Sequence, residues 1–161
     1  MMSPAAEEGC RAATDADVPR LEELARGAIE ELRGGRGGEV WSRHAARLEP
    51  LADGLTRQVH AEDHQVLVGT VDGTIMGYGV ARVEVLADQG LLGVVTDLYT
   101  EPGCRELGIG EVTMQALVDW CAAQGCFGVD SLALPGDRHT KNFFESFGLV
   151  ARAIIVHRRL S

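Results

Sequence analysis

The sequence has few basic residues and no long apolar run. Its 161 residues carry 15 Lys plus Arg against 24 Asp plus Glu, and Lys141 is the only lysine. Neither half of the chain is basic enough to offer the surface that nucleic acids require, so no nucleic-acid partner is expected. The longest apolar runs, such as residues 91–95, have the length of a strand. We therefore expect no membrane span.

Cysteine is also scarce, and its spacing excludes common metal sites. The four cysteines, at positions 10, 104, 121 and 126, form neither a C-x-x-C pair nor a zinc-finger pattern. This spacing favours reduced thiols in a cytoplasmic protein. His60 and His64 are four residues apart, but no third ligand accompanies them, so no metal site is predicted. Residues 1–9 lack the basic and apolar parts of a secretion signal.

What remains is the composition of an ordinary globular protein. Apolar residues make up 45% of the chain and charged residues 24%. A chain of this length can bury a sizeable core, and we expect one domain over residues 1–161.

Helical spacing is clearest in the first third of the chain. A short strand near residues 11–13 is followed by Thr14 and Asp17, which are good helix caps. Apolar residues then recur at helical spacing from Val18 to Leu32, up to the glycine-rich residues 34–38. Residues 40–59 form a second helical stretch, interrupted by Pro50 and Gly54.

The pattern changes to strands after residue 63. Three strands joined by short turns, at residues 64–71, 75–87 and 91–100, predict an antiparallel meander. A glycine-bearing loop then leads to a helix, a strand, a short helix and a last strand, at residues 109–124, 127–134, 138–147 and 149–157. This order predicts an α/β (α+β) fold, in which a mixed, mostly antiparallel central sheet has helices on both faces.

The strongest chemical signal lies between the third strand of the meander and the next helix. It is the segment Arg105-Glu106-Leu107-Gly108-Ile109-Gly110. Glycines allow close approach of the backbone, and free N–H groups at a helix start favour a diphosphate. A P-loop is excluded because Glu111 follows Gly110, and Thr113 stands where a dinucleotide fingerprint needs a small residue.

In its context this segment resembles the acetyl-CoA signature of the GNAT N-acetyltransferase superfamily, Q/R-x-x-G-x-G/A. In that family the signature follows a strand that ends in a pattern like L-Y-V-x-P, and here Leu98-Tyr99-Thr100-Glu101-Pro102 precedes it. A second family landmark, N-x-x-A-x-x-x-Y-x-x-x-G-F, appears in weaker form over residues 137–149. The resemblance implies acetyl-CoA as co-substrate and transfer of acetyl to a primary amine of a small molecule or peptide by direct attack.

The resemblance also assigns residues to acetyl-CoA. Backbone groups of one strand end would hold the pantetheine arm, namely those of Leu98, Tyr99 and Thr100. The pyrophosphate would lie on backbone N–H groups of the loop and helix start, from Glu106, Leu107, Gly108, Gly110 and Glu111. Arg105 is either a cofactor contact or structural. Further contacts would come from the second landmark, through Asp137, Lys141, Asn142 and Phe144. Asp137 is also a plausible helix cap, and Lys141 a solvated surface lysine.

Two positions depart from the family pattern, since Asp137 replaces an Asn and Phe144 replaces the Tyr that often protonates the leaving thiolate. A thiol with a pKa near 8.5 needs that proton less than an alcohol would, so the loss slows transfer without preventing it. It also leaves open a non-catalytic acyl-CoA-binding module or sensor.

The attacking amine must lose a proton, and two carboxylates are candidate catalytic bases. Asp97 lies in the otherwise apolar run 94–98, where several relatives place an acid. Its alternative interpretation is a hydrogen-bonded strand residue that holds a neighbouring loop. Glu84 is the second candidate. We expect the acceptor pocket between the first two helices, residues 34–38 and the strand around Glu84, and a homodimer is left open.

Overall fold

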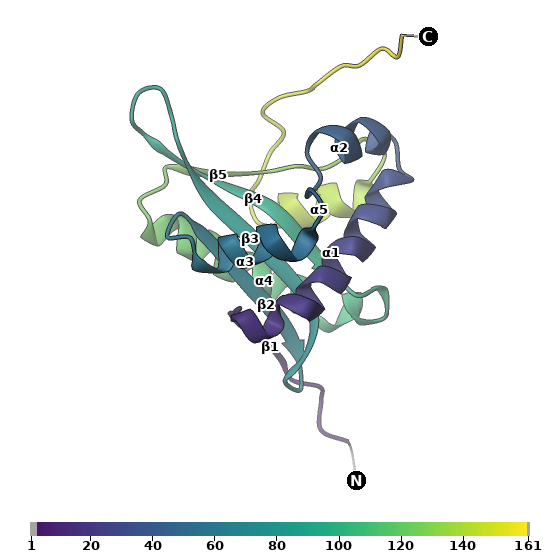
Figure 1. Cartoon of the computed structure of the whole chain (residues 1–161), viewed down its shortest axis with the longest axis vertical. Helices are drawn as coiled ribbons and strands as arrows, with labels where there is room; N and C mark the ends of the chain where they lie inside the picture. The colour runs from purple at the N-terminus through teal and green to yellow at the C-terminus, as the bar shows by residue number, and fades with distance from the viewer. Residues whose placement is uncertain (1–2, 161) are drawn as a thin grey trace.

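A computed structural model describes residues 3–160 and contains one five-stranded sheet in the order β1-β2-β3-β4-β5 (Figure 1). The strands are β1 (Glu8–Ala12), β2 (His64–Val71), β3 (Thr74–Val85), β4 (Leu91–Thr100) and β5 (Gly128–Ser131). Neighbouring strands are antiparallel except β4 and β5, which are parallel. The predicted mixed, mostly antiparallel sheet is therefore confirmed.

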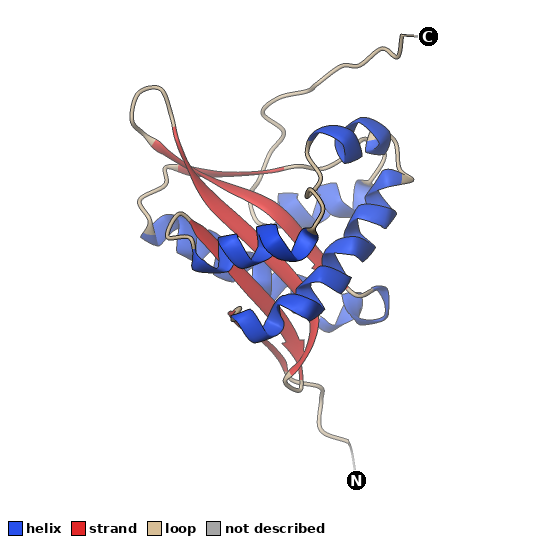
Figure 2. Cartoon of the chain, in the orientation of Figure 1, coloured by secondary structure: helices blue, strands red, loops and turns tan. Residues whose placement is uncertain are grey.

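Helices cover both faces of the sheet, as Figure 2 shows. The helices α1 (Val18–Arg33) and α3 (Leu51–His60) pack on one face, and α4 (Ile109–Ala123) and α5 (Arg138–Ser146) on the other. Three shorter helices complete the fold: η1 (Asp15–Asp17), α2 (Gly38–His44) and η2 (Pro102–Leu107).

Side chains along each strand alternate between the two faces of the sheet, and this divides the core into two layers. On β2, Val66 and Val68 face α1 and α3, whereas Leu67 between them faces α4. Successive side chains of a strand point to opposite faces, so a buried strand with apolar residues on both sides serves two helical layers. The continuous apolar run of β2 follows from this position.

The helical stretch predicted over residues 40–59 is two helices in the structure. A loop over residues 45–50 separates α2 from α3. Pro50 has no N–H to donate within a helix, and it stands just before α3 begins at Leu51. The predicted strand over residues 127–134 is also shorter in the structure, because only Gly128–Ser131 pairs with β4.

The prediction of a last strand over residues 149–157 is wrong. These residues form no helix or strand, and residues 150–160 are exposed. Their one backbone bond to the body is from the Leu149 N–H to the Phe144 carbonyl, within the part of the chain that the structure describes. A strand needs a neighbour for its backbone groups, and this segment lacks one.

Candidate active site

The sheet splits between β4 and β5. The two strands pair only from Leu92 to Val95 on β4, opposite Gly128 to Ser131 on β5. Farther along, residues 97–100 remain paired with β3 but have no strand partner on their other side among residues 3–160. Polar backbone groups on this edge of β4 are therefore available to a ligand that lies along the strand.

A β-bulge at Thr96 turns the side chains of β4 just before the split. On β3, Val80 pairs with Asp97 and its neighbour Ala81 pairs with Val95, so Thr96 is an extra residue. Without a bulge, Val95 and Asp97 would share one face of the sheet. Here Val95 packs toward α4, whereas Asp97 bonds to Tyr78 on the opposite face.

The N-terminus of α4 lies beside the split and has unused backbone donors. Gly108 precedes α4 with a φ of +78°, a left-handed conformation that glycine adopts readily. The first bond of the helix runs from the Val112 N–H to the Gly108 carbonyl. The N–H groups of Ile109, Gly110 and Glu111 have no partner within residues 3–160, and the positive end of the helix dipole adds to their attraction for an anion.

Arg105 joins this loop to α1. Its guanidinium donates to both carboxylate oxygens of Glu31 at 2.9 and 2.6 Å, and its Nε donates to the Thr100 carbonyl at 3.0 Å. It also lies 5.5 Å from the ring centre of Tyr99. Of the two roles predicted for Arg105, these contacts describe the structural one.

Asp97 lies at the split, but its surroundings are not apolar as expected. The Arg47 guanidinium donates to both Asp97 oxygens at 2.9 and 2.8 Å. The Tyr78 hydroxyl adds a bond of 2.7 Å to Oδ2, and the Thr96 hydroxyl one of 2.7 Å to Oδ1. All four bonds go to one carboxylate, so each of its oxygens accepts two. The alternative interpretation of Asp97, a strand residue that holds a neighbouring loop, describes this geometry.

Apart from Thr96, which is exposed, the side chains of this cluster are shielded from solvent. The side chains of Arg47 and Asp97 are only 12% and 14% exposed. Burial lowers the pKa of Arg47, but the attraction of Asp97 outweighs it, so the pKa is raised and the guanidinium stays charged. Burial and the charge of Asp97 raise the pKa of Tyr78 well above its ordinary value, so its hydroxyl remains a donor.

The residues of the second landmark lie in and just before α5, and they make different contacts. Asp137 caps α5, because its carboxylate accepts from the N–H and the hydroxyl of Thr140 at 3.0 and 2.6 Å. Burial raises the pKa of Asp137, but these bonds and the nearby charges of His139 and Arg105 outweigh burial and lower it. Phe144 is buried in the core under α4. Phe143 is the ring that approaches Gly110, at 3.6 Å from where a side chain there would begin.

Lys141 is 62% exposed and lies 3.5 Å from Glu145 on the same helix. Asn142 is also exposed. Glu84 is exposed near the far end of β3, opposite Leu92, whereas Asp97 is opposite Val80. Four residues of strand separate these two pairs, about 13 Å. The structure therefore does not bring Glu84 and Asp97 together.

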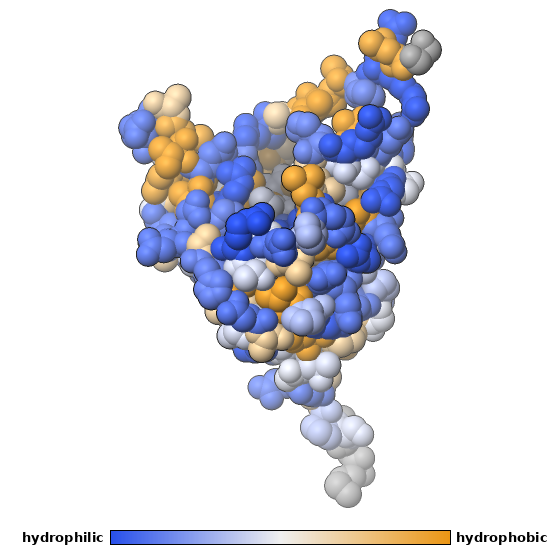
Figure 3. Space-filling view, in the orientation of Figure 1, coloured by the Kyte–Doolittle hydropathy of each residue, from blue (hydrophilic) through white to orange (hydrophobic). Residues whose placement is uncertain are grey.

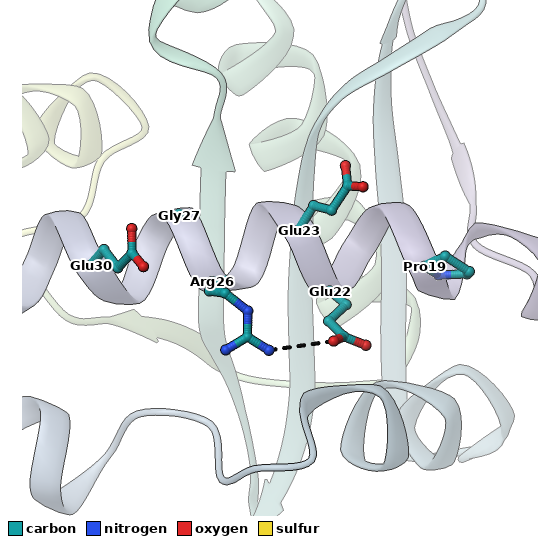
Figure 4. Close-up of a pocket in the computed structure, with 6 residues that line it drawn as sticks. All are labelled: Pro19, Glu22, Glu23, Arg26, Gly27 and Glu30. Atoms are coloured by element: carbon teal, nitrogen blue, oxygen red, sulfur yellow. Dashed lines mark hydrogen bonds and ion pairs between the residues drawn. The ribbon is translucent and has the colours of Figure 1, made fainter.

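Two hollows border α1 on the side away from α4. The larger one, about 500 Å³, is lined only by residues of α1, including Glu22, Glu23 and Glu30 (Figure 4). A smaller one of about 130 Å³ lies between α1, α2 and α3, with Arg47 in its wall. The glycine-rich loop after α1 contacts the loop before α5, since Gly37 lies against Pro135.

Arg47 and Tyr78 are among the residues of the site that sequence reasoning missed. Arg47 lies in an irregular loop, fifty positions before its partner. Tyr78 reads as an ordinary core residue of a strand, and it is buried among core residues. No spacing in the sequence links either residue to Asp97.

In residues 3–160 no three or more His, Cys, Asp or Glu side chains are grouped as a metal site would need. Nor does the described chain contain a helix that is both long and apolar enough to cross a membrane.

Comparison with known proteins identifies the family. The sequence matches the Acetyltransferase (GNAT) family over residues 22–149. The chain therefore belongs to the GNAT acetyltransferase family, and acetyl transfer is the activity that this membership supports. No match was found among curated proteins.

Solved structures confirm the fold. A protein from Bacillus halodurans superposes with a TM-score of 0.79 at 21% identity, over 94% of this chain and 99% of that one. An aminoglycoside acetyltransferase from an uncultured soil metagenomic sample, in complex with trehalose, gives 0.71 at 18%, over 96% and 95%. AAC(6')-Iy, in complex with the bisubstrate analogue CoA-S-monomethyl-acetylneamine, gives 0.73 at 13%, over 96% and 99%.

Proposed function

We propose that this protein transfers the acetyl group of acetyl-CoA to a primary amine of a small molecule or peptide by direct attack. The observation that carries the proposal is the unpaired half of β4 beside the unused N–H groups of α4. The first can bind an extended pantetheine arm through the backbone, and the second can bind its pyrophosphate.

The residues of the loop and of α4 fit this co-substrate. The backbone donors of Gly110 and Glu111 need no rearrangement, and Gly108 has the backbone conformation that starts the helix there. Arg105 is committed to Glu31, so we assign it the task of fixing the loop against α1 rather than binding phosphate. Phe143 lies beside Gly110 and closes the site on the α5 side.

The acidic surface of α1 supports an amine acceptor. An alkylamine is a cation at neutral pH, with a pKa around 10, before it loses its proton to become a nucleophile. The larger hollow on α1 is lined by three glutamates and by Arg26, which is paired with Glu22. Gly27 also lines this hollow and lies against the Tyr99 hydroxyl, so α1 packs directly on the end of β4 here.

Asp97 is the proposed proton acceptor, and its contacts define what must happen first. Both of its oxygens are occupied in the structure, so Arg47 has to release at least one of them before a proton or a water can bind. We therefore propose that the loop over residues 45–50 moves when the acceptor binds. Glu84 lies too far along β3 to share this role.

Two variants test the role of Asp97. Asp97→Asn should abolish amine-dependent CoA release and keep acetyl-CoA binding, since the cofactor surfaces are elsewhere. Arg47→Gln should keep measurable CoA release if Asp97 is the base, because it frees the carboxylate. Equal loss of CoA release in both variants would show that the pair only positions the loop.

The alternative function, a non-catalytic acyl-CoA-binding module, predicts a different result. Such a protein would bind acetyl-CoA but release no CoA with any member of a broad amine panel. The presence of Phe144 supports this alternative, because a phenylalanine side chain has no hydroxyl that could protonate the thiolate.

A further inference from the structure

The smaller of the two hollows beside α1 is the one that borders the buried ion pair. It lies between α1, α2 and α3, has a volume of about 130 Å³, and includes Arg47 in its wall. The larger hollow is lined by residues of α1 alone. Pockets for drug-sized ligands have about 300–1,000 Å³, so the smaller hollow suits a small acceptor.

The lining of this hollow is rich in arginine, although the chain has a formal net charge of −9. Arg26, Arg33 and Arg47 all line it; Arg26 is paired with Glu49, and Arg47 is paired with Asp97. In Figure 3 the surface around α1 and α2 is mostly hydrophilic (blue). Guanidinium groups recognise carboxylates through two parallel N–H donors, so the hollow favours an acceptor that carries a carboxylate.

The buried pair limits which amines can reach Asp97. Arg47 and Asp97 are 12% and 14% exposed, and together they are neutral. A simple alkylammonium that displaced Arg47 from Asp97 would leave the guanidinium without a counter-charge, and an uncompensated buried charge is strongly unfavourable. An acceptor that carries both an ammonium and a carboxylate avoids this cost. Its carboxylate would accept from Arg47 while its ammonium donates to Asp97, and the total charge would not change.

The geometry of the pair also limits the spacing of the two charges in the acceptor. The donors of Arg47 lie only 2.8 and 2.9 Å from the oxygens of Asp97. In an α-amino acid the ammonium and the carboxylate are attached to one carbon, so a small separation of the pair admits both groups. Asp97 would keep its bonds from Tyr78 and Thr96 during this exchange, which hold the carboxylate in place.

We propose that the acceptor is a free α-amino acid, which inserts between Arg47 and Asp97. This inference rests on the proposed acetyl transfer. Asp97 accepts one proton from the ammonium, the nitrogen bonds to the acetyl carbon, and the thioester C–S bond breaks with its electron pair on sulfur. The nitrogen loses a second proton as the amide forms, and the thiolate takes up one proton. One proton is therefore released to solvent for each acetyl group transferred.

A panel of matched acceptors tests the inference on the native chain. Each free L-amino acid is compared with its own carboxamide, which has the same α-amine and side chain but no carboxylate, and CoA release is followed with a thiol reagent. We expect at least one free amino acid to exceed its carboxamide by about 100-fold in kcat/KM, because the carboxamide leaves Arg47 unpaired.

Equal or faster acetylation of carboxamides, or of amines that lack a carboxylate, overturns this inference and leaves the proposed acetyl transfer intact. A different result contradicts the proposed transfer itself: acetyl-CoA binds by calorimetric titration, but no amine of either kind causes CoA release. The inference then fails with it.

Arg47→Gln tests whether Arg47 is the group that recognises the carboxylate. The preference for the free amino acid over its carboxamide should fall to about onefold, chiefly through a higher KM for the free amino acid. Arg43→Gln is the control, since it removes the same charge from an α2 side chain that is 80% exposed, and it should keep the preference. A preference that persists in Arg47→Gln overturns the role of Arg47. If Arg47→Gln does not fold, the acceptor panel on the native chain still decides the substrate class.

Discussion

At the scale of single residues, ion pairs differ in how much they stabilise the fold, and the pairs of Arg47 and Arg26 show the contrast. The Arg47 side chain is 12% exposed and meets a carboxylate that is 14% exposed. Arg26 is 47% exposed and pairs with Glu22 and Glu49 at the surface. A buried pair that loses one member leaves an uncompensated charge, whereas water solvates the remaining partner of a surface pair.

Arg47→Ala is therefore expected to lower the free energy of unfolding by about 3 kcal/mol. Arg26→Ala should have a much smaller effect. Urea denaturation followed by circular dichroism measures both. Similar losses in the two variants would mean that the Arg47–Asp97 pair is as well solvated as the surface pair.

The lowered pKa of Asp17 predicts that the stability of the fold depends on pH. Hydrogen bonds from Arg11 hold the pKa of Asp17 at about 2, below its ordinary 3.8, against the opposing effect of burial. Because the folded-state pKa is the lower one, this contribution is fully present above the unfolded-state pKa. It is lost as the pH falls through about 2, and it amounts to about 2 kcal/mol.

The difference in unfolding free energy between the native chain and Asp17→Asn should accordingly shrink as the pH is lowered from about 5 to about 2. Urea denaturation at a series of pH values measures it. Asp15→Asn, on the same turn but with a carboxylate that is 65% exposed, serves as the control. A difference for Asp17→Asn that does not change with pH would contradict the assigned pKa.

At the scale of elements, the start of α4 carries the proposed phosphate site. Gly110 has ordinary space around it, because a methyl group added there would lie 3.6 Å from the Phe143 ring and 3.7 Å from the Thr100 hydroxyl. An alanine there would fit the helix and would favour it by up to about 1 kcal/mol. A larger, branched side chain such as valine would narrow the approach of a ligand to the N–H groups at the helix start.

Gly110→Val should thus weaken acetyl-CoA binding by about tenfold, or about 1.4 kcal/mol. Calorimetric titration measures the affinity. Gly110→Ala is the matched control, because the signature that this segment resembles accepts alanine at this position, and its affinity should stay close to that of the native chain. Unchanged affinity in Gly110→Val would show that the phosphate does not bind at the start of α4.

Elements with a strong local pattern could be predicted from the sequence, and those that depend on a partner could not. The helix α4 begins at Ile109, as predicted, because glycine, apolar spacing and the preceding strand all agree there. The strand predicted over residues 149–157 has the right composition but no neighbour in the chain. The bulge at Thr96 has no local signature, so the direction of Asp97 could not be read from alternation.

The candidate site could be predicted only where it consists of backbone. The segment from Gly108 to Glu111 lies at a helix start, as its glycines indicate. The side-chain cluster around Asp97 could not be predicted, since Arg47 and Tyr78 come from a loop and a different strand. Such contacts depend on tertiary packing that local patterns do not encode.

At the scale of the whole molecule, the split sheet and the net negative charge both bear on how the proposed co-substrate would bind. The split opens between β4 and β5, the α4 N-terminus lies beside it, and α1 packs on Tyr99 at Gly27. With a formal net charge of −9, the protein repels free anions. The proposed binding of a polyanionic co-substrate would therefore depend on the local donors of β4 and α4.

Thermal unfolding with and without acetyl-CoA tests this central claim most directly. At a ligand concentration about 100 times Kd, binding adds roughly 2.7 kcal/mol, which for a chain of this size raises Tm by about 5 to 11 °C. We expect that shift with acetyl-CoA and none with NADH or ATP. No shift with millimolar acetyl-CoA would show that the loop before α4 is only a turn and that the proposed site does not bind the co-substrate.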